Sequence, residues 1–387
     1  MGATRVAVAG AGQTHYAAKR QDVSMAGLVR EAAQRALEDA GMDWADIDTV
    51  VLGKAPDMFE GLMMPELYLA DALGANGKPM LRVHTAGSVG GSTAVVATHH
   101  VSSGRFERVL TVAWEKQSES NAMWALSVKP PFGQQAVAGA GGYFAPIVRG
   151  YIRKSNAPLD TGYKVAFKDR SNALKNEYAH LRDPDLTYEA VANSPLLWDP
   201  IRYHETCPSS DGAAAMVLVG EDVADGMGDH PLAWIHGTSV KSEPTIGAGR
   251  DRVNPWAARA CSDEVYRQAG ITDPRTQLDC AELYVPFSWF EPMWLESHGI
   301  APENEGWKMT QAGVTALDGD FPVNMSGGVL SSNPIGASGM IRFLEVAQQV
   351  RGLAGEHQVD GARTALGQAY GGGSQFFATW VVGTARP

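Results

Sequence analysis

The N-terminal segment alternates between short apolar runs and one amphipathic stretch, and this alternation constrains the fold more than any other feature. Residues 5–9 and 49–52 are rich in small and β-branched side chains, as in buried strands. Between them, residues 25–40 carry apolar side chains at helical spacing, and Gly41 follows as a natural helix stop. Strand, helix and strand in this order predict a βαβ unit, in which a helix packs against the face of a sheet.

The same alternation recurs later in the chain. It appears twice more as strand, helix and strand, at residues 82–85, 94–102 and 109–113, and at residues 232–236, 254–269 and 279–284. A chain of 387 residues is long enough for two domains of ordinary size. The repeated pattern predicts an α/β protein with two related lobes, residues 1–220 and residues 221–387.

Residues 116–202 interrupt the pattern. Pro130, Pro131 and the glycine-rich run at residues 138–144 show neither a helical nor a strand period. This stretch is expected to be an inserted, loop-rich region of the first lobe. Long insertions often cover active sites, so we expect it to act as a lid.

Charge and cysteine content narrow the function classes. The 32 Lys and Arg residues are outnumbered by 43 Asp and Glu residues, giving a formal charge of −11, which argues against nucleic-acid binding. No run of about 18 apolar residues occurs, so no membrane span is expected. Cys207, Cys261 and Cys280 are too widely spaced for a disulfide framework or a zinc site. We therefore expect a cytoplasmic protein with no metal site.

Several motifs occur in an order that resembles the thiolase superfamily. They are the Cys-Pro-Ser-Ser-Asp-Gly-Ala-Ala-Ala run at 207–215, Glu-Leu-Tyr-Val-Pro-Phe at 282–287, Asn-Met-Ser-Gly-Gly at 324–328, Asn-Pro-Ile-Gly-Ala-Ser-Gly at 333–339, and the triple glycine at 371–373. The resemblance covers nearly the whole chain. It implies an α/β thiolase fold, in which two related lobes form αβαβα layers with an inserted lid.

The catalytic positions of that family are all altered. The resemblance places Gly87 where thiolases have a nucleophilic cysteine, and Asn333 where they have a histidine. Ala369 replaces the second cysteine, and Tyr284 replaces an asparagine. Covalent acyl transfer is therefore a poor hypothesis, because the thiolate and its imidazole are missing. Ser88 can be considered as a substitute nucleophile, but no base is assigned to it.

The replacements suit a different chemistry. Tyr284 and Tyr370 are expected to act as general acid or base, and Asn333 to donate a hydrogen bond to an oxyanion. Backbone amides of Gly371, Gly372 and Gly373 are expected to help hold the substrate. Histidine at position 84 is a further catalytic candidate, because its strand leads to the altered nucleophile position.

Within the superfamily, the chain resembles the lipid-transfer-protein and sterol carrier protein x branch, on residues 19–30 and 114–124. That branch includes actinobacterial aldolases that cleave steroid side-chain CoA esters. The resemblance implies a lyase that performs retro-aldol cleavage of a β-hydroxyacyl-CoA, with no cofactor besides the CoA thioester substrate. It also implies a homodimer formed through the N-terminal lobes and a separate partner with an OB fold and a zinc ribbon.

Two other readings remain open. The chain is an acyltransferase with a recruited nucleophile, or a non-catalytic subunit that binds CoA esters. Arg149 is a candidate for binding the CoA phosphates, together with Arg153 and Lys154, although a basic helix face is usually only solvated. The aromatic side chains of the insertion, Trp124, Phe132, Tyr143 and Phe144, either line an acyl pocket or belong to the core. Cys207 is expected to be a small buried residue.

Overall fold

The computed structural model describes residues 4–55, 57–120, 139–244 and 249–387. In these residues nine strands form one mixed sheet in the order β3-β2-β4-β7-β1-β8-β11-β10-β9. The strands of this sheet are β1 (Val6–Gln13), β2 (Thr49–Lys54), β3 (Met80–Val83), β4 (Arg108–Lys116), β7 (Asp211–Gly220), β8 (Ala233–Ser242), β9 (Cys280–Glu282), β10 (Thr364–Gly371) and β11 (Phe376–Gly383).

The sheet consists of two halves joined by a short contact. Strand β1 ends the first half and pairs with β8 of the second half at only two positions, Ala7 with Trp234 and Val8 with Ala233. Strands β2, β3 and β4 are parallel to one another, as are β9 and β10, while the other neighbours are antiparallel. None of the three predicted βαβ units has its two strands side by side: β2 lies between β3 and β4, and other strands separate β1 from β2 and β8 from β9.

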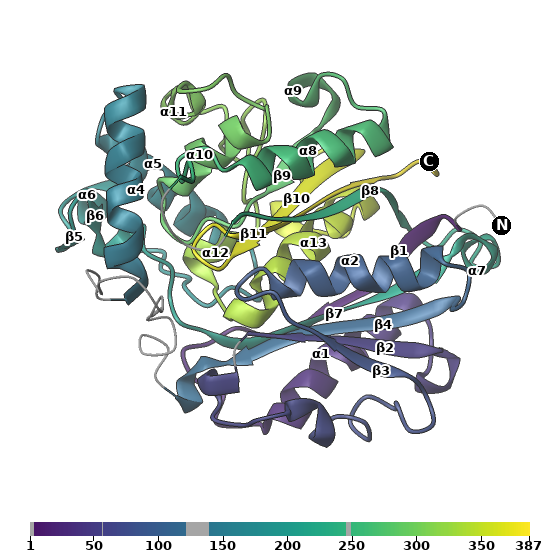
Figure 1. The fold of residues 1–387 in the computed structure, drawn as a ribbon. Coiled ribbons are helices and arrows are strands. Elements are labelled where there is room, and N and C mark those ends of the chain that lie inside the picture. Colours follow the sequence, from purple (N-terminus) through teal and green to yellow (C-terminus); the bar gives the residue numbers. More distant parts are fainter. Residues whose placement is uncertain (1–3, 56, 121–138, 245–248) are drawn as a thin grey trace.

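Helices separate and cover the two half-sheets. Helices α2 (Val89–Ser102) and α13 (Ile335–Arg351) contact each other and strands of both halves. Helix α1 (Met25–Ala40) packs on β1, β7 and β4, and α8 (Trp256–Ala269) packs on β8 and β11. Figure 1 shows the two central helices between the half-sheets, so the predicted αβαβα layering is confirmed.

Glycine allows the two central helices to approach closely. A Cβ atom on Gly90 of α2 would lie 2.6 Å from the backbone nitrogen of Met340 and 2.8 Å from the carbonyl oxygen of Gly336, both in α13. No side chain fits at that distance, so a residue other than glycine would push the helices apart. This contact fixes the start of α13, which follows Asn333 of the candidate site by two residues.

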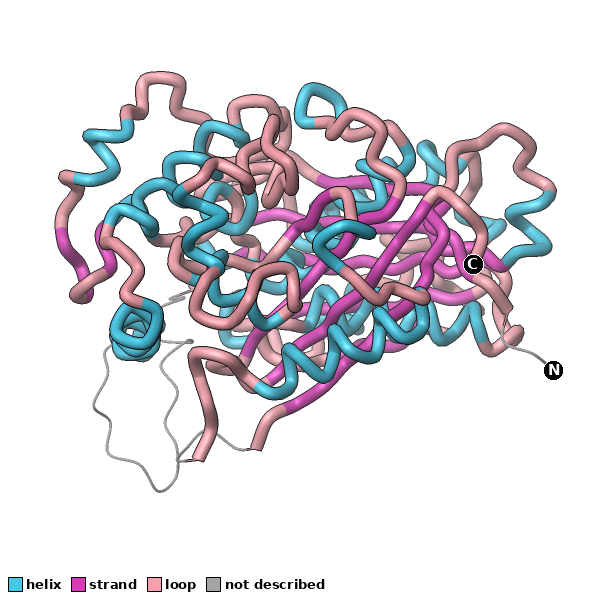
Figure 2. The backbone as a smooth tube through the Cα atoms, turned by 90° about the horizontal axis from the view of Figure 1, so that it is seen from above, coloured by secondary structure: helices cyan, strands magenta, loops and turns pink. Residues whose placement is uncertain are grey.

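The insertion contains more helix than its sequence suggests. It forms α4 (Gly139–Ser155), α5 (Asp160–Ala173), α6 (Tyr188–Ala192), β5 (Leu196–Trp198) and β6 (Ile201–Arg202). The expectation of a loop-rich region is therefore wrong for α4 and α5. In α4, Phe144, Ile147, Val148 and Tyr151 form a buried face, but the glycines at its start and Pro146 hide this period. Figures 1 and 2 both place the insertion at the end of the molecule away from the two termini.

The remaining short helices connect the main elements. They are α7 (Glu221–Asp225), α9 (Pro274–Gln277), α10 (Phe290–Ser297), α11 (Gly306–Gln311) and α12 (Gly328–Ser331). In the part of the chain that the structure describes, no helix is long and apolar enough to cross a bilayer.

Candidate functional site

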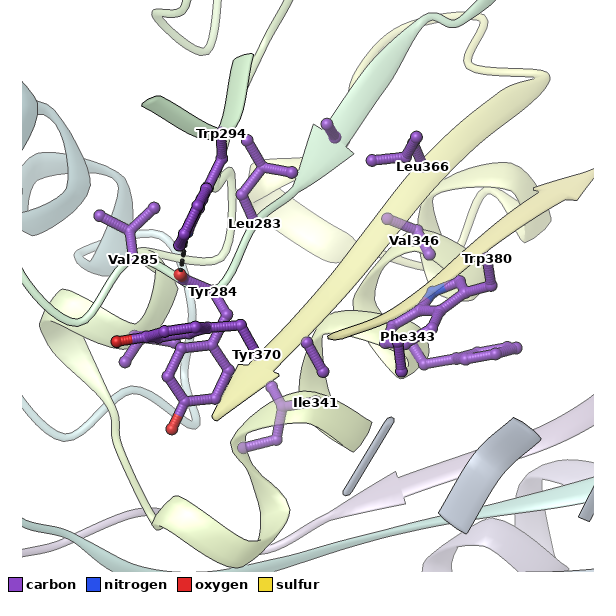
Figure 3. Close-up of a cluster of buried hydrophobic side chains, with 14 of the residues drawn as sticks. Leu283, Tyr284, Val285, Trp294, Ile341, Phe343, Val346, Leu366, Tyr370 and Trp380 are labelled. Carbon is purple, nitrogen blue, oxygen red and sulfur yellow. Dashed lines mark hydrogen bonds between the residues drawn. The ribbon is translucent and has the colours of Figure 1, made fainter. Parts of the chain in front are cut away.

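Tyr284 and Tyr370 lie side by side inside the second lobe. Tyr284 follows the end of β9 by two residues, and Tyr370 is in the neighbouring strand β10. Their ring centroids are 5.4 Å apart and their ring planes are inclined by 75°. Both side chains are buried, with 4% and 3% of their surface exposed. The structure thus brings together the two tyrosines that the sequence singled out (Figure 3).

Backbone hydrogen bonds fix Tyr284 in this position. Its backbone N–H donates to the side-chain oxygen of Gln368 at 2.9 Å, and its carbonyl oxygen accepts from the indole N–H of Trp294 at 2.7 Å. The second bond is the dashed line in Figure 3. Because Gln368 is in β10 and Trp294 in α10, the segment after β9 is held from two sides.

An aromatic wall surrounds the phenol of Tyr370. Its ring centroid lies 5.8 Å from that of Phe290, 5.3 Å from Trp294 and 5.9 Å from Phe377. The ring of Phe144, from the insertion helix α4, lies 6.2 Å away. The insertion therefore contributes an apolar side chain next to the tyrosine pair, in keeping with a covering role.

Asn333 connects the tyrosine pair to the first lobe. Its side-chain oxygen accepts from the Tyr284 hydroxyl at 3.3 Å and from Ser338 Oγ at 2.8 Å. Its side-chain nitrogen donates to Cys207 Sγ at 3.2 Å. Sulfur is a weak acceptor, so a substrate oxygen can replace it on this nitrogen at small cost. Asn333 thus lies next to the Tyr284 phenol, and its role as a donor to an oxyanion stays a prediction.

Cys207 is a site residue that the sequence analysis missed. We expected a small buried residue; the residue as a whole is partly exposed, but its thiol is buried and contacts Asn333. Its segment pairs with the chain after Tyr284, since the Cys207 N–H donates to the carbonyl oxygen of Pro286 at 3.0 Å. In the sequence, Cys207 belongs to a motif of small residues, which indicates a structural role. The spacing of residues along the chain does not predict its contact with Asn333.

Two further polar side chains hold the backbone of Asn333. Its N–H donates to Ser210 Oγ at 3.1 Å, and its carbonyl oxygen accepts from Gln117 Nε2 at 2.5 Å. Gln117 Nε2 also donates to the carbonyl oxygen of Ser210 at 3.1 Å. Ser210 Oγ in turn lies 2.8 Å from His180 Nδ1. The sequence analysis gave no role to Ser210, Gln117 or His180, because they come from distant segments that share no motif.

Burial sets the protonation of the phenols and the thiol. It raises the pKa of Tyr284 and Tyr370 well above the usual range, and the proximity of the two rings raises that of Tyr370 further. Burial also raises the pKa of the Cys207 thiol to about 11, although the hydrogen bond from Asn333 opposes this change. All three groups are therefore protonated at neutral pH. In the resting site the tyrosines are proton donors, and a role as resting base is excluded.

The glycine turn and the altered nucleophile loop meet next to Tyr370. A Cβ atom on Gly371 would lie 2.3 Å from the backbone nitrogen of Ser88 and 2.5 Å from that of Gly87. Gly372 and Gly373 both have φ of 62°, a conformation that favours glycine. Gly87 therefore lies where the resemblance placed it, against the end of β10, but it offers no side chain to the site.

The two other predicted residues lie apart from this centre. His84 lies just after β3 with part of its surface exposed, and the partial burial of its ring together with Arg82 lowers its pKa. Arg149 is exposed in α4 and forms an ion pair with Asp199. Among the described residues, neither makes a hydrogen bond to the tyrosines or to Asn333. Trp124 and Phe132 fall outside the described residues.

Two family models match most of the chain. The family model "Thiolase, N-terminal domain" matches residues 6–138, and "Thiolase C-terminal domain-like" matches residues 239–384. The chain is 30% identical over 376 residues to an acetyl-CoA acetyltransferase of Methanothermobacter thermautotrophicus, covering 95% of this chain and 96% of that protein. It is 26% identical to human sterol carrier protein 2, covering 97% of this chain and 71% of that protein.

Two solved structures share the fold over almost their full length. One is titled "Ltp2-ChsH2(DUF35) aldolase", with a TM-score of 0.83, 24% identity, and coverage of 100% of this chain and 99% of that chain. The other is human mitochondrial 3-ketoacyl-CoA thiolase, with a TM-score of 0.75, 16% identity, and 99% of both chains covered. At these identities the likeness establishes the fold.

Proposed function

Because the chain belongs to the thiolase family, we propose that it is an enzyme acting on an acyl-CoA thioester, and that its reaction is retro-aldol cleavage of a β-hydroxyacyl-CoA. The proposed substrate class is a steroid side-chain CoA ester, and no further cofactor is required. The observation that carries the proposal is the buried pair of phenols, Tyr284 and Tyr370, with Asn333 hydrogen-bonded to Tyr284.

The proposed reaction uses donors rather than a nucleophile. The bond between the α- and β-carbons breaks, the β-hydroxyl becomes a carbonyl group, and the electron pair moves into the thioester as an enolate. Asn333 Nδ2 leaves the weak Cys207 contact and donates to the enolate oxygen. One phenol gives its proton to the α-carbon, and the hydroxyl proton returns to the pair. The tyrosines thus end the reaction with both protons restored.

The raised pKa values favour this order of events. A phenol with a raised pKa gives up its proton only as the α-carbon gains negative charge, and the phenolate that forms is a strong base. Its oxygen accepts the hydroxyl proton in the same step, as the carbon–carbon bond breaks, so the carbonyl product leaves neutral and no separate resting base is needed. The aromatic wall around Tyr370 excludes water and suits an apolar substrate.

The rival acyltransferase reading has one observation in its favour. Cys207 brings a thiol next to Asn333, at the place where a recruited nucleophile would be useful. However, the pKa of this thiol is raised to about 11, so very little thiolate exists at neutral pH. The rival predicts an acyl group on the protein, and the lyase predicts none.

We propose two kinds of partner for this chain, a separate protein and a second copy of itself. The solved structure titled "Ltp2-ChsH2(DUF35) aldolase" supports a separate partner protein for this chain, which we expect to carry the OB fold and zinc ribbon. We also propose a homodimer formed through β3, an edge strand of the sheet. Leu81 in this strand is 50% exposed, and Met63, Met64, Leu67 and Tyr68 before it are also exposed. Such a group of apolar side chains is typical of an interface.

Mass spectrometry of the reaction products tests the proposal. A steroid β-hydroxyacyl-CoA is incubated with the protein, with and without a co-expressed OB-fold partner. We expect a ketone or aldehyde and a shorter acyl-CoA, and we expect Tyr284→Phe and Tyr370→Phe to abolish both products. Tyr266→Phe is the matched control, because its buried hydroxyl donates to the carbonyl oxygen of His298, outside the site. Ligand binding without cleavage under both conditions would support the non-catalytic subunit instead.

A further inference from the structure

We infer that His180 is a positioning residue for Asn333 and that it acts through the hydroxyl of Ser210. The inference rests on the proposed role of Asn333 in stabilising the enolate. His180 lies in the insertion, Ser210 precedes β7, and Asn333 precedes α13, so the three residues join separate parts of the fold.

The geometry forms a continuous path between these residues. Ser210 Oγ lies 2.8 Å from His180 Nδ1 and accepts the backbone N–H of Asn333 at 3.1 Å. Ser210 is fully buried, so neither bond is replaced by a bond to bulk water. The side chain of His180 is half-buried at the outer end of the path.

The donors and acceptors at Ser210 determine which ring nitrogen of His180 carries the hydrogen. The hydroxyl hydrogen of Ser210 needs an acceptor, and within the described part of the chain His180 Nδ1 is its neighbour besides Asn333. Nδ1 must then be unprotonated, with the ring hydrogen on Nε2. Burial and the nearby Arg170 lower the pKa of His180, while Asp211 opposes them, so the ring is neutral at pH 7. A neutral ring is the form that the path requires.

The same segment of the insertion also binds the chain just before Asn333. The His180 N–H donates to Ser332 Oγ at 2.9 Å, and the Leu181 N–H donates to the carbonyl oxygen of Ser331 at 3.0 Å. Residues 180 and 181 therefore hold residues 331–333 at three points, two directly and one through Ser210. Two of these points use backbone N–H groups of the insertion, which a change of the His180 side chain leaves in place.

This arrangement explains what the side chain of His180 adds. Asn333 has to keep its side-chain nitrogen aimed at the place of the enolate oxygen while its contact with Cys207 is exchanged. A fixed backbone N–H at Asn333 limits the rotation of the residue during that exchange. Loss of the path would lower the rate of cleavage more than the affinity for substrate.

Four variants test the inference. His180→Ala removes the acceptor, Ser210→Ala removes the bridge, and the double variant removes both. His180→Asn keeps an acceptor, because the side-chain oxygen of Asn is bonded to Cγ as Nδ1 is in His. His236→Ala is the control, since the ring of His236 is likewise hydrogen-bonded, but to the carbonyl oxygen of Ala385 near the C-terminus.

Two measurements are made on each variant. Steady-state cleavage gives kcat and KM, and hydrogen–deuterium exchange with mass spectrometry follows the peptide that contains Asn333. We expect His180→Ala and Ser210→Ala each to lower kcat by roughly three- to tenfold, as for one lost hydrogen bond, with KM unchanged. The double variant should show no further loss. Exchange in the peptide should be faster in all three, and His180→Asn should restore both readouts.

Either of two results would overturn the inference. If His180→Asn is as slow as His180→Ala, or if exchange in the Asn333 peptide is unchanged in His180→Ala, the path does not position Asn333. The exchange measurement needs no substrate. If the wild-type protein cleaves no β-hydroxyacyl-CoA, the proposed function fails, and the exchange result still decides whether the path exists.

Discussion

Replacing Gly371 by alanine tests the contact between the glycine turn and the altered nucleophile loop. A Cβ atom at this position would lie 2.3 Å from the backbone nitrogen of Ser88, whereas ordinary contacts begin at 3.4 Å. The two segments must therefore separate by about 1 Å. The atoms in the way are backbone atoms, which cannot rotate aside as a flexible side chain can. Either the loop at Gly87 or the end of β10, with Tyr370, has to move.

The size of the effect follows from this displacement. Overpacking of this kind costs about 1 to 3 kcal/mol, and we expect the upper end because backbone is displaced. A misplacement of about 1 Å in a catalytic group typically costs on the order of a hundredfold in rate. We therefore expect Gly371→Ala to lower the free energy of unfolding by about 3 kcal/mol and the cleavage rate by about a hundredfold.

Urea unfolding and the cleavage assay measure the two effects. Gly361→Ala is the matched control, because a Cβ atom there meets nothing within 4 Å, although φ is +71°. It should lose about 1 to 2 kcal/mol from its backbone conformation alone and keep its activity. If Gly371→Ala is no less stable than wild type and cleaves at the wild-type rate, the described contact is wrong.

Three other predictions address separate parts of the account. Cys207→Ser should keep the cleavage rate within about threefold of wild type, because a hydroxyl oxygen still accepts from Asn333; an acyltransferase that uses this thiol would lose its activity. Burial disfavours a charged His357, but Glu345 at 2.9 Å outweighs burial and raises the pKa of His357. The ion pair between His357 and Glu345 therefore stabilises the folded protein fully below about pH 6.5, and this stabilisation is lost as the pH rises through the folded-state pKa of His357. We expect His357→Asn to lower the free energy of unfolding in urea more at pH 6 than at pH 9. Leu81→Arg should convert the proposed dimer into monomers in size-exclusion chromatography with light scattering, and a mass equal to that of wild type would rule out an interface at β3.

The parts of the fold that were predictable have strong local signals. Helix α1 begins and ends at the predicted residues, Met25 and Ala40, because apolar side chains repeat along one face. Ser24 caps its start, and Gly41, with φ of 64°, ends it. Helix α4 lacks such signals, since glycines and Pro146 contradict its helical period. Its buried face is specified by packing against the second lobe, which no local pattern reveals.

The candidate site was predictable only in part. Tyr284, Tyr370 and Asn333 were found because each occupies a motif position that the family fixes in space. Cys207 and His180 were missed, because their importance arises from contacts with Asn333 and Ser210 that form only in the folded chain. The protonation state of the tyrosines could not be predicted from the sequence either, because it depends on how deeply the folded chain buries them.

A single-turnover reaction in D2O, followed by mass spectrometry of both products and protein, tests the central claim most directly. The tyrosine pair is proposed to deliver a solvent-exchangeable proton to the α-carbon without any covalent intermediate. We predict a ketone or aldehyde, a shorter acyl-CoA carrying one deuterium at its α-carbon, and a protein of unchanged mass. An acyl group on the protein, or cleavage that persists in Tyr370→Phe at the wild-type rate, would contradict the account.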